Sequence, residues 1–359
     1  MIALKLPVLR RHIALALMLA LAPAFAEPLP AMVRFGVSNA GVGTPPRIGT
    51  GWMAVAQTKG FIEEELKKDN VKVQWTFFKG QGPQVNEALT NDQLDFTTLG
   101  DLPSVIGRSV GIKARLVMVT STRSNSYVAV RPDSGIKTIA ELRGKRVGFH
   151  KGTATQLAVS RILEQNGLSE RDIKVINLEP ASSLAAFQTG NLDAIFGTLN
   201  LKVLESRGQA RIIYSTRDNA IAGGNGHVLV TDRFSSTYPE LTQRVVTALV
   251  RAASYASQEA HRSEVLNLWA SSGSIPAALY DEELRGIPLA HRHSPRFDNF
   301  VRAADQRSME DAYRFKLIRK RFSVDDWIDD RYVNRAVEEL GLDTAWHRFD
   351  ASGRIVTVR

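Results

Sequence analysis

Four short stretches of the chain combine glycine with a hydroxyl, amide or carboxylate side chain directly after a predicted strand. Glycine lets backbone N–H groups approach a bound oxygen atom closely, and threonine, glutamine and asparagine add neutral donors. A helix that begins at the same point contributes unpaired N–H groups and a partial positive charge. This is the chemistry of a small-anion site, although Gly and Thr also favour ordinary turns between strands and helices. The stretches are Gly80-Gln81-Gly82, Gly100-Asp101, Gly152-Thr153-Ala154-Thr155 and Gly197-Thr198-Leu199-Asn200.

Two side chains near these turns have competing interpretations. Trp52, at the start of a predicted helix, is placed to cover an apolar part of a ligand, and packing in the core is the alternative. Asp101 carries a negative charge that would repel an anion. We interpret it first as a helix cap and second as a partner for a cationic group of a ligand.

The sequence gives no sign of catalysis or metal binding. It contains no Cys, which removes thiol nucleophiles, thiolate zinc sites, iron–sulfur clusters and disulfides. It has neither His-Glu-x-x-His spacing nor a Ser–His–Asp pattern, and His291-Arg-His293 is typical of a solvated loop. We therefore predict no catalytic residue, no metal site and no cofactor, in a protein that is not an enzyme.

The elements that must position these turns alternate along the chain. Short apolar runs predict strands, and stretches of helical periodicity lie between them, which is typical of an α/β fold with mostly parallel sheets. The predicted strands are residues 32–37, 71–78, 94–99, 114–119, 127–131, 145–149, 173–178, 193–197, 211–214 and 227–231. The predicted helices are residues 51–66, 83–89, 154–165, 183–188 and a short one near Lys202, and the chain after residue 231 is predicted to be largely helical.

Two local patterns add detail to this outline. Ser323 and Asp326 have the spacing of a helix cap and predict a helix that runs to about residue 340. Residues 88–96 and 186–194 repeat one pattern, in which a helix ends in a polar turn and Leu-Asp opens a buried strand. This internal echo favours two similar α/β units.

The N-terminus has the features of an export signal. Lys5, Arg10 and Arg11 precede an apolar run over residues 13–21, and Ala24-Phe25-Ala26 is a small-x-small cleavage site. The apolar run is shorter than the roughly 18 residues of a membrane anchor. We expect cleavage after Ala26 and, because no Cys is available for lipid attachment, a freely diffusing protein of the periplasm.

The charge balance does not indicate a nucleic-acid partner. The formal net charge is +9, and three of the cations lie within residues 1–26, which hold no acidic residue. Lys and Arg are spread over the rest of the chain without a basic block. This distribution is typical of an ordinary solvated surface.

Several weak segments succeed one another in a recognisable order. They are Val73-Gln-Trp75-Thr-Phe-Phe-Lys-Gly80, Gly82-Pro83-Gln84, Leu94-Asp95-Phe96, Gly100-Asp101-Leu-Pro103, Thr138-Ile139-Ala140-Glu141-Leu142, Gly144-Lys-Arg-Val147, Lys151-Gly152-Thr153, Ala185-Ala-Phe187 and Gly190-Asn-Leu-Asp193-Ala194. This order resembles the substrate-binding proteins of sulfonate, taurine and nitrate ABC importers, and most of all the aliphatic-sulfonate members. The resemblance covers about residues 33–284.

The resemblance implies two α/β lobes that are joined by two crossing strands and close over a ligand held between them. It assigns residues 27–123 and 228–359 to lobe I, including a helical C-terminal tail, and residues 124–227 to lobe II. The crossings would fall near residues 120–126 and 225–230.

Three positions take a role from this resemblance. Gly152-Thr153 aligns with a ligand-contacting turn in relatives. Ser124 and His227 lie at the implied crossings, where hinge and ligand roles both stay open.

The implied ligand is a small organic anion, most of all an alkanesulfonate. A sulfonate is a fixed monoanion with three acceptor oxygens, so neutral donors from both lobes are sufficient to hold it. The resemblance implies a monomeric carrier that passes this ligand to the membrane permease of an ABC importer. A sulfate ester, taurine and nitrate remain alternative ligands. A sensor without transport remains an alternative function, whereas the similar thiamine-pyrimidine synthases need a Cys-rich motif that is absent here.

Two features depart from the family pattern. Many relatives have a Trp in the segment that corresponds to residues 198–200, and this chain has none there. We therefore expect a smaller or more polar pocket wall. The tail over residues 291–359 is longer than in the shorter sulfonate binders, and its apolar residues predict helices packed on the outside of lobe I.

Overall fold

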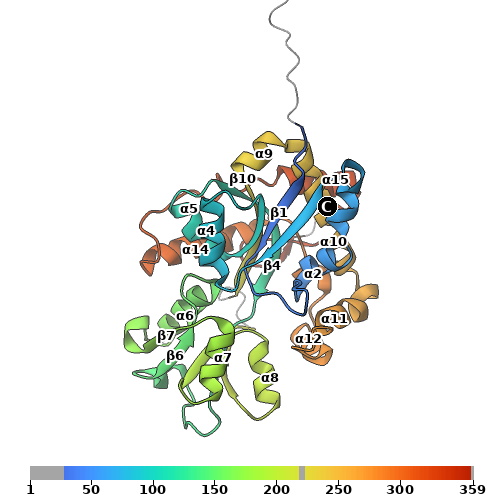
Figure 1. Cartoon of the computed structure of the whole chain (residues 1–359). Coiled ribbons are helices and arrows are strands. Elements are labelled where there is room, and N and C mark those ends of the chain that lie inside the picture. Colours follow the sequence, from blue (N-terminus) through green and yellow to red (C-terminus); the bar gives the residue numbers. More distant parts are fainter. Residues whose placement is uncertain (1–27, 218–222, 357–359) are drawn as a thin grey trace, which may run out of the picture.

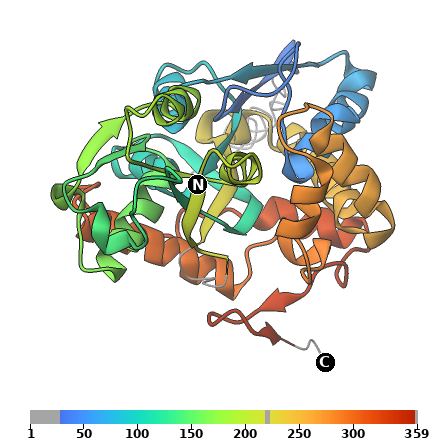
Figure 2. The same ribbon diagram turned by 90° about the horizontal axis from the view of Figure 1, so that it is seen from below.

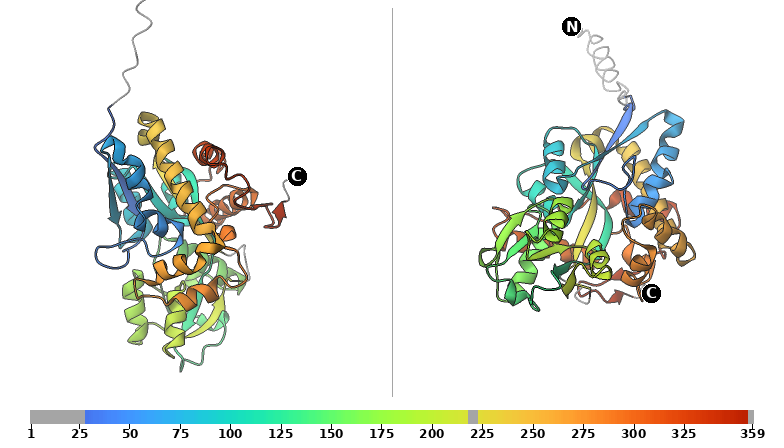
Figure 3. Two further views of the ribbon diagram at one scale, coloured as in Figure 1. Left: turned by 90° about the vertical axis from the view of Figure 1, so that its right-hand side faces the viewer. Right: turned by 60° about the horizontal axis from the view of Figure 1, so that its bottom comes forward.

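The computed structural model describes residues 28–217 and 223–356, so the predicted export signal lies outside the described residues. The described chain forms two α/β lobes, each built on a five-stranded sheet (Figure 1). Lobe I, above in that view, contains the N- and C-terminal parts of the chain, and lobe II, below, contains the middle part. The left view of Figure 3 shows lobe I above lobe II from another side, and the right view brings lobe II forward. The two-lobed α/β fold predicted from the sequence is confirmed.

The two sheets have the same spatial plan. The strands of lobe I are β1 (Met32–Val37), β2 (Lys72–Phe77), β3 (Phe96–Gly100), β4 (Ala114–Ser124) and β10 (Gly224–Thr231). The strands of lobe II are β5 (Tyr127–Val130), β6 (Arg146–Phe149), β7 (Lys174–Asn177), β8 (Ala194–Gly197) and β9 (Arg211–Ser215). The order is β2-β1-β3-β10-β4 in lobe I and β7-β6-β8-β5-β9 in lobe II.

All but one of the strands in each sheet run toward the other lobe. The exceptions are β10 and β5, which pair antiparallel with both of their neighbours. Each of them is the strand that arrives from the other lobe and therefore runs away from it. The sheets are thus mixed. In each sheet the other strands all run in one direction, and to this extent the prediction of mostly parallel strands holds. Their carboxyl ends face the space between the lobes.

The chain crosses between the lobes twice. The first crossing joins β4, which ends at Ser124, to β5, and it falls within the predicted residues 120–126. The sequence places the second crossing at residues 225–230, but these residues belong to β10 and pair with β3 and β4. The crossing therefore lies between Ser215 and Gly224, and the predicted end of lobe II at residue 227 falls inside a strand of lobe I.

Helices cover both faces of each sheet. In lobe I, α2 (Gly51–Thr58), α3 (Phe61–Leu66) and α10 (Pro239–Ser257) pack together on one side, and α4 (Gln81–Thr90) and α5 (Asp101–Ser109) pack on the other (Figure 1). In lobe II, α6 (Ala154–Gln165) covers one face, and α7 (Pro180–Gln188) and α8 (Asn200–Ser206) cover the other. The remaining α-helices are α9 (Asp232–Thr237), α11 (Arg262–Ala270), α12 (Ala277–Glu283), α13 (Leu289–Arg292), α14 (Asn299–Arg314) and α15 (Arg331–Glu339). The 3-10 helices are η1 (Lys67–Asp69), η2 (Ile139–Leu142), η3 (Glu170–Asp172) and η4 (Glu259–His261).

The strand β5, which lies between β8 and β9, is buried on both faces. Val128 and Val130 join the apolar cluster beneath α6, whereas Tyr127 and Ala129 join the cluster beneath α7 and α8. Successive side chains of a strand point to opposite faces, so a run of four apolar residues is what a doubly covered strand requires.

The two segments with the repeated Leu-Asp pattern, residues 88–96 and 186–194, form equivalent ion pairs in the two lobes. Asp95 accepts hydrogen bonds from the backbone N–H and the guanidinium of Arg34, at 2.9 and 2.7 Å. Asp193 accepts from the same two groups of Arg146, both at 2.7 Å. In each lobe the Leu-Asp carboxylate ties the start of one strand to its parallel neighbour, which explains why this pair of residues recurs.

Two helix boundaries differ from the prediction. The helix predicted over residues 51–66 is divided into α2 and α3 at Gly60, whose φ of 68° is left-handed. The predicted cap at Ser323 closes a turn, in which the Asp326 N–H donates to the Ser323 hydroxyl at 3.3 Å, and α15 begins only at Arg331. Such a bond satisfies a turn as well as a helix, so it does not determine where the next helix begins.

The C-terminal tail packs on lobe I, and its helix α14 also contacts α6 of lobe II. Trp327, Val333 and Trp346 are buried in the core of that lobe. The chain ends in a small hairpin of β11 (Arg348–Phe349) and β12 (Ile355–Val356), which projects from the body of the molecule in Figure 2. Within residues 28–217 and 223–356, no helix is both long and apolar enough to cross a membrane.

Candidate ligand-binding cleft

The strand ends of lobe I enclose an inner cavity of about 290 Å³. Its walls come from the ends of β1, β3 and β4, the start of β10 and the first turn of α2, and Ala154 contributes from lobe II. Of the described residues that line it, none is charged. The polar side chains in the lining are Ser38, Asn39, Thr50, Thr98, Thr120, Ser121, Ser124 and Asn225. The cavity therefore offers neutral hydroxyl and amide donors, which suits an anion that keeps its charge.

Helix α2 presents its N-terminal turn to the inner cavity. Thr50, Gly51 and Met53 line the cavity, and the N-cap residue Thr50 makes no side-chain hydrogen bond to the helix. Gly51 has a φ of 74°, which is left-handed and favours glycine. The first N–H groups of a helix have no partner within it and carry a partial positive charge. This turn is therefore a candidate anion-binding feature of lobe I.

An outer cavity of about 560 Å³ adjoins the inner one and reaches lobe II. The two cavities share Asn39, Gly49 and Thr50. The outer cavity has charged groups at Lys79 and Glu179. Its apolar lining includes Val42, Phe149, Leu178, Pro180, Ile195, Phe196, Ile275 and Tyr280. It therefore has room for a part of a ligand that is larger and less polar than the anionic group.

One imidazole lines the outer cavity from lobe II. His150 follows β6, and its Nδ1 lies 3.0 Å from the amide oxygen of Gln81 in lobe I. Burial lowers the pKa of His150, so the ring is neutral at neutral pH. It adds a polar group to the cleft without adding a charge.

Five of the predicted site residues line the cleft. Ser124 lines the inner cavity, and Gln81, Thr155, Thr198 and Asn200 line the outer one. They come from the first crossing, from the N-terminus of α4 and from two strand-to-helix turns of lobe II. The cleft thus brings together donors that are up to 119 positions apart, between Gln81 and Asn200.

The predicted glycines lie beside the cleft and allow close packing. The Gly80 N–H donates to the Gln84 side chain at 2.7 Å. A Cβ atom on Gly82 would lie 2.3 Å from Pro103 and 3.3 Å from the carbonyl oxygen of Gly152 in lobe II. Gly152 itself has a left-handed φ of 74°. These glycines are explained by close approach of the two lobes and by backbone conformation.

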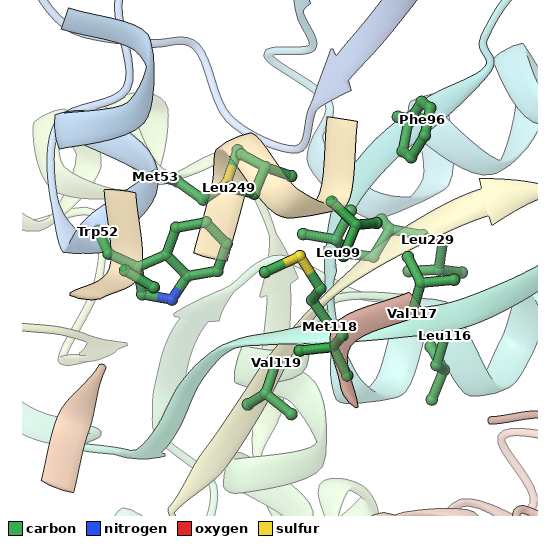
Figure 4. Close-up of a cluster of buried hydrophobic side chains, with 14 of the residues drawn as sticks. Trp52, Met53, Phe96, Leu99, Leu116, Val117, Met118, Val119, Leu229 and Leu249 are labelled. Carbon is green, nitrogen blue, oxygen red and sulfur yellow. The ribbon is translucent and has the colours of Figure 1, made fainter. Parts of the chain in front are cut away.

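Thr153 and Trp52 are buried away from the cleft lining. The Thr153 hydroxyl donates to the carbonyl oxygen of His150 at 2.7 Å and thereby supports the turn that carries the imidazole. Trp52 is fully buried in the lobe I core drawn in Figure 4, where it lies near Met53. In this arrangement of the lobes, Trp52 has the core position that the alternative interpretation predicts.

Asp101 lies behind the inner cavity at the first residue of α5. Its carboxylate accepts from the Leu102 N–H at 2.8 Å and from the Ser308 hydroxyl at 3.1 Å. The N-cap of α5 is Gly100 and no side chain caps this helix, so the cap interpretation of Asp101 is wrong. Burial raises the pKa of Asp101, and the nearby guanidinium of Arg161 opposes that shift. The carboxylate does not line either cavity.

His227 is also buried behind the inner cavity. Its Nε2 lies 3.0 Å from the carboxylate of Asp305, and its ring stacks on that of Phe297. His227 lies within β10 and does not line either cavity. Its partners come from the C-terminal tail, which no local pattern around residue 227 signals.

The sequence prediction missed most of the polar lining of the inner cavity. Ser38 and Asn39 follow the end of β1, Thr98 lies within β3, and Thr50 precedes α2. The rule that ligands bind beyond the carboxyl ends of strands also applies to β1 and signals Ser38 and Asn39. No glycine follows Val37 directly, so the pattern of glycine next to a donor does not mark this turn.

Two lobes with equivalent sheets and a cleft at their facing strand ends define the class of two-lobed periplasmic binding proteins. The structure of the periplasmic sulfonate-binding protein SsuA from Methylobacillus flagellatus has a TM-score of 0.75 and 29% identity, over 90% of this chain and 98% of that one. The alkanesulfonate-binding protein SsuA from Xanthomonas axonopodis, bound to MOPS, has a TM-score of 0.69 and 26% identity, over 84% and 99%.

The family model described as NMT1/THI5 like matches residues 50–262. The chain belongs to this family. A Bacillus subtilis protein named as an aliphatic sulfonates-binding protein is 27% identical over 290 residues, which are 80% of this chain and 85% of the relative. These matches confirm the resemblance given by the order of segments. A desulfurization enzyme with 18% identity and a TM-score of 0.65 shares the fold, which therefore serves both binding and catalysis.

Proposed function

We propose that this protein captures a small organic sulfonate in the periplasm and delivers it to the membrane permease of an ABC importer. The observation that carries the proposal is the inner cavity, whose lining combines neutral donors with the first turn of α2. The names of the relatives, which refer to sulfonate binding, support the ligand class.

The two cavities suggest where the anionic group and the organic part of such a ligand would bind. The sulfonate oxygens would accept hydrogen bonds in the inner cavity, from the first N–H groups of α2 and from hydroxyls such as those of Thr50 and Thr98. The organic part would extend into the outer cavity toward Phe196 and Tyr280. Pockets for organic ligands have volumes of roughly 300–1,000 Å³. Nitrate would leave the outer cavity without a ligand group, so the cavities favour an anion with an organic part.

Closure of the lobes would complete the site. Donors from lobe I and from Thr155 and Thr198 of lobe II contact one ligand only when the lobes are together, so a ligand shifts the population toward that arrangement. We propose that the lobes pivot where the chain crosses between them, about residues 124–126 at the first crossing. The permease would then distinguish loaded from empty protein by shape.

Three alternatives differ in what they predict. A sulfate ester or taurine would use the same inner cavity with another organic part. A sensor would bind the same ligand and contact a receptor in place of a permease. An enzyme on this fold would change its ligand, whereas a carrier releases it intact.

The test is a comparison of ligands by thermal unfolding and calorimetry. Alkanesulfonates, arylsulfonates, MOPS, sulfate esters, taurine and nitrate are each added to the purified protein. A sulfonate at one hundred times its Kd should stabilise the fold by about 2.7 kcal/mol. Recovery of the bound sulfonate unchanged, checked by mass spectrometry, supports a carrier over an enzyme. Stabilisation by nitrate without any response to a sulfonate would overturn the proposed ligand class.

Compartment and assembly have separate tests. We propose that the signal is cleaved after Ala26 and that the product is a soluble monomer of the periplasm. Cell fractionation and the N-terminal sequence of the secreted protein test the first statement. Light scattering coupled to gel filtration tests the second, and a stable dimer would contradict it.

A further inference from the structure

Helix α14 of the C-terminal tail lies against both lobes. It packs on α5 and β10 of lobe I and on α6 of lobe II, and Figures 1 and 2 show it running beside both. Asp305, Ser308 and Asp311 are spaced three residues apart along it, so their side chains share one face of the helix. On the side of lobe II, this face of α14 contacts the buried guanidinium of Arg161.

Arg161 of α6 reaches from lobe II into the contact between α5 and α14. Its Nε donates to the Asp311 carboxylate at 2.7 Å, and its Nη2 donates to the Ser308 hydroxyl at 3.2 Å. Its Nη1 lies 3.9 Å from the Asp101 carboxylate of lobe I. The side chains of Arg161 and Asp101 are only 9% and 2% exposed. One cation of lobe II is thus held by groups of lobe I and of the tail.

Separation of the lobes at this point would be unfavourable. Movement of α6 away from α5 and α14 would remove Arg161 from both carboxylates together. Asp101 would keep its contacts to Leu102 and Ser308 but lose the guanidinium that faces it. Removing one partner of a buried ion pair is costly because the remaining charge is left uncompensated. The contact therefore favours the packed arrangement before any ligand is present.

The same helix also holds a residue of the inner cavity. The Asp305 carboxylate accepts from the Asn225 amide at 3.2 Å and lies 3.0 Å from Nε2 of His227. Asn225 lines the inner cavity. Displacement of α14 would therefore alter both the contact between the lobes and the orientation of a cavity side chain.

We propose that Arg161 and α14 form a third connection between the lobes, in addition to the two chain crossings, and that it raises the fraction of ligand-free protein in the packed arrangement, which a ligand raises further. The proposal concerns the protein without ligand. Its effect on affinity rests on the proposed function, because it requires a ligand that binds between the lobes.

The test is the distance between the lobes in solution. The chain has no Cys, so Asn91→Cys in lobe I and Gln188→Cys in lobe II, both at exposed positions, introduce two spin labels and no others. Double electron–electron resonance then reports the label separation in the background of Arg161→Gln, Asp311→Asn or Glu164→Gln. Asp311→Asn protects the test if Arg161→Gln does not fold, because Asp311 is partly exposed and Arg161 keeps its contacts to Ser308 and Asp101.

Glu164→Gln is the matched control. Glu164 of α6 pairs with Arg314 of α14 between the same two helices, but both side chains are about half exposed, and such pairs contribute little. We expect longer label separations for Arg161→Gln and Asp311→Asn without ligand, and an unchanged separation for Glu164→Gln. Addition of MOPS should restore the shorter separation, with a Kd about fivefold weaker than in the parent.

Two results would overturn the proposal. One is a ligand-free separation in Arg161→Gln and Asp311→Asn that equals that of the parent. The other is an equal change in Glu164→Gln, which would show that surface charge in general sets the separation. If neither MOPS nor another sulfonate binds the parent, the proposed function fails, and the ligand-free comparison still decides whether the third connection exists.

Discussion

The Nδ1 atom of His150 lies 3.0 Å from the side-chain oxygen of Gln81, and this contact joins lobe II to lobe I across the rim of the outer cavity. An amide oxygen only accepts, so Nδ1 carries the proton and donates. Burial lowers the pKa of His150, which keeps the ring neutral at neutral pH. The bond is therefore between neutral groups, and it exists only while the lobes are together.

Loss of this bond should weaken ligand binding without affecting the fold. A neutral hydrogen bond contributes about 0.5–1.5 kcal/mol, which corresponds to about a two- to tenfold change in Kd. We expect a change of this size for Gln81→Ala, measured by calorimetry with the best sulfonate ligand. Gln188→Ala, which removes an exposed amide at the end of α7, serves as the control. Equal affinities for Gln81→Ala and the parent would show that the contact plays no part in binding.

Substitutions of two adjacent threonines of β3 should have different effects, one on ligand binding and the other on stability. Thr98 lines the inner cavity, whereas the buried Thr97 hydroxyl donates to the carbonyl oxygen of Gly36 at 2.9 Å. Valine has nearly the shape of threonine without its hydroxyl. Thr98→Val should therefore weaken sulfonate binding about two- to tenfold and leave the melting temperature nearly unchanged. Thr97→Val should lower stability by about 1 kcal/mol and leave affinity nearly unchanged. The reverse pattern would show that the ligand does not occupy the inner cavity.

Most of the fold was predictable because its signals are local. A strand buried on both faces needs a continuous apolar run, and the echo at Leu94 and Leu192 reflects one packing requirement in both lobes. A Cβ atom on Gly36 would lie 2.5 Å from Leu94, and one on Gly148 would lie 2.4 Å from Leu192. Each leucine therefore needs a glycine on the neighbouring strand. The second crossing was placed too late because the first half of β10, Gly224-Asn-Gly-His227, carries no apolar strand pattern and its pairing partners are distant in sequence.

The site was predictable only where donors follow strands. Thr155, Thr198 and Asn200 lie in such turns, and they line the cleft. Asp101 lies in an equivalent turn, yet its carboxylate faces Ser308, which is 207 positions away in the sequence. Burial by a distant segment cannot be deduced from the residues around a turn. For the same reason, the sequence could not separate a lining threonine from a buried one in the turn that holds Thr153.

That turn allows a second matched pair of substitutions, in lobe II. Thr155 lines the outer cavity, and the buried Thr153 donates to the carbonyl oxygen of His150 at 2.7 Å. We expect Thr155→Val to weaken binding about two- to tenfold at unchanged stability. Thr153→Val should lower the free energy of unfolding by about 1 kcal/mol. Calorimetry and denaturant unfolding separate the two effects. Normal affinity in Thr155→Val would show that the Thr155 hydroxyl does not bind the ligand.

Stability should fall in acid because of one buried imidazole. His293 is buried in lobe I, and its Nδ1 lies 2.9 Å from the carbonyl oxygen of Ala256, to which the neutral ring donates. Burial lowers the pKa of His293 to about 4. In the unfolded chain the pKa is about 6.5. Between these values the unfolded state binds more protons, so the free energy of unfolding decreases as the pH falls from about 7 to about 4.

The size of this effect is about 3 kcal/mol across the window, from about 1.4 kcal/mol for each unit of pKa difference. Asp101 contributes with the opposite sign, because its pKa is raised by burial, so the parent must be compared with a variant at every pH.

His293→Asn keeps a donor near Ala256 and removes the titrating ring. We expect it to be less stable than the parent at pH 7, with a gap that narrows as the pH approaches 4. His347→Asn, at an exposed imidazole, should follow the parent. Denaturant unfolding at several pH values measures both gaps, and a gap for His293→Asn that stays constant from pH 7 to pH 4 would show that His293 does not titrate in this range.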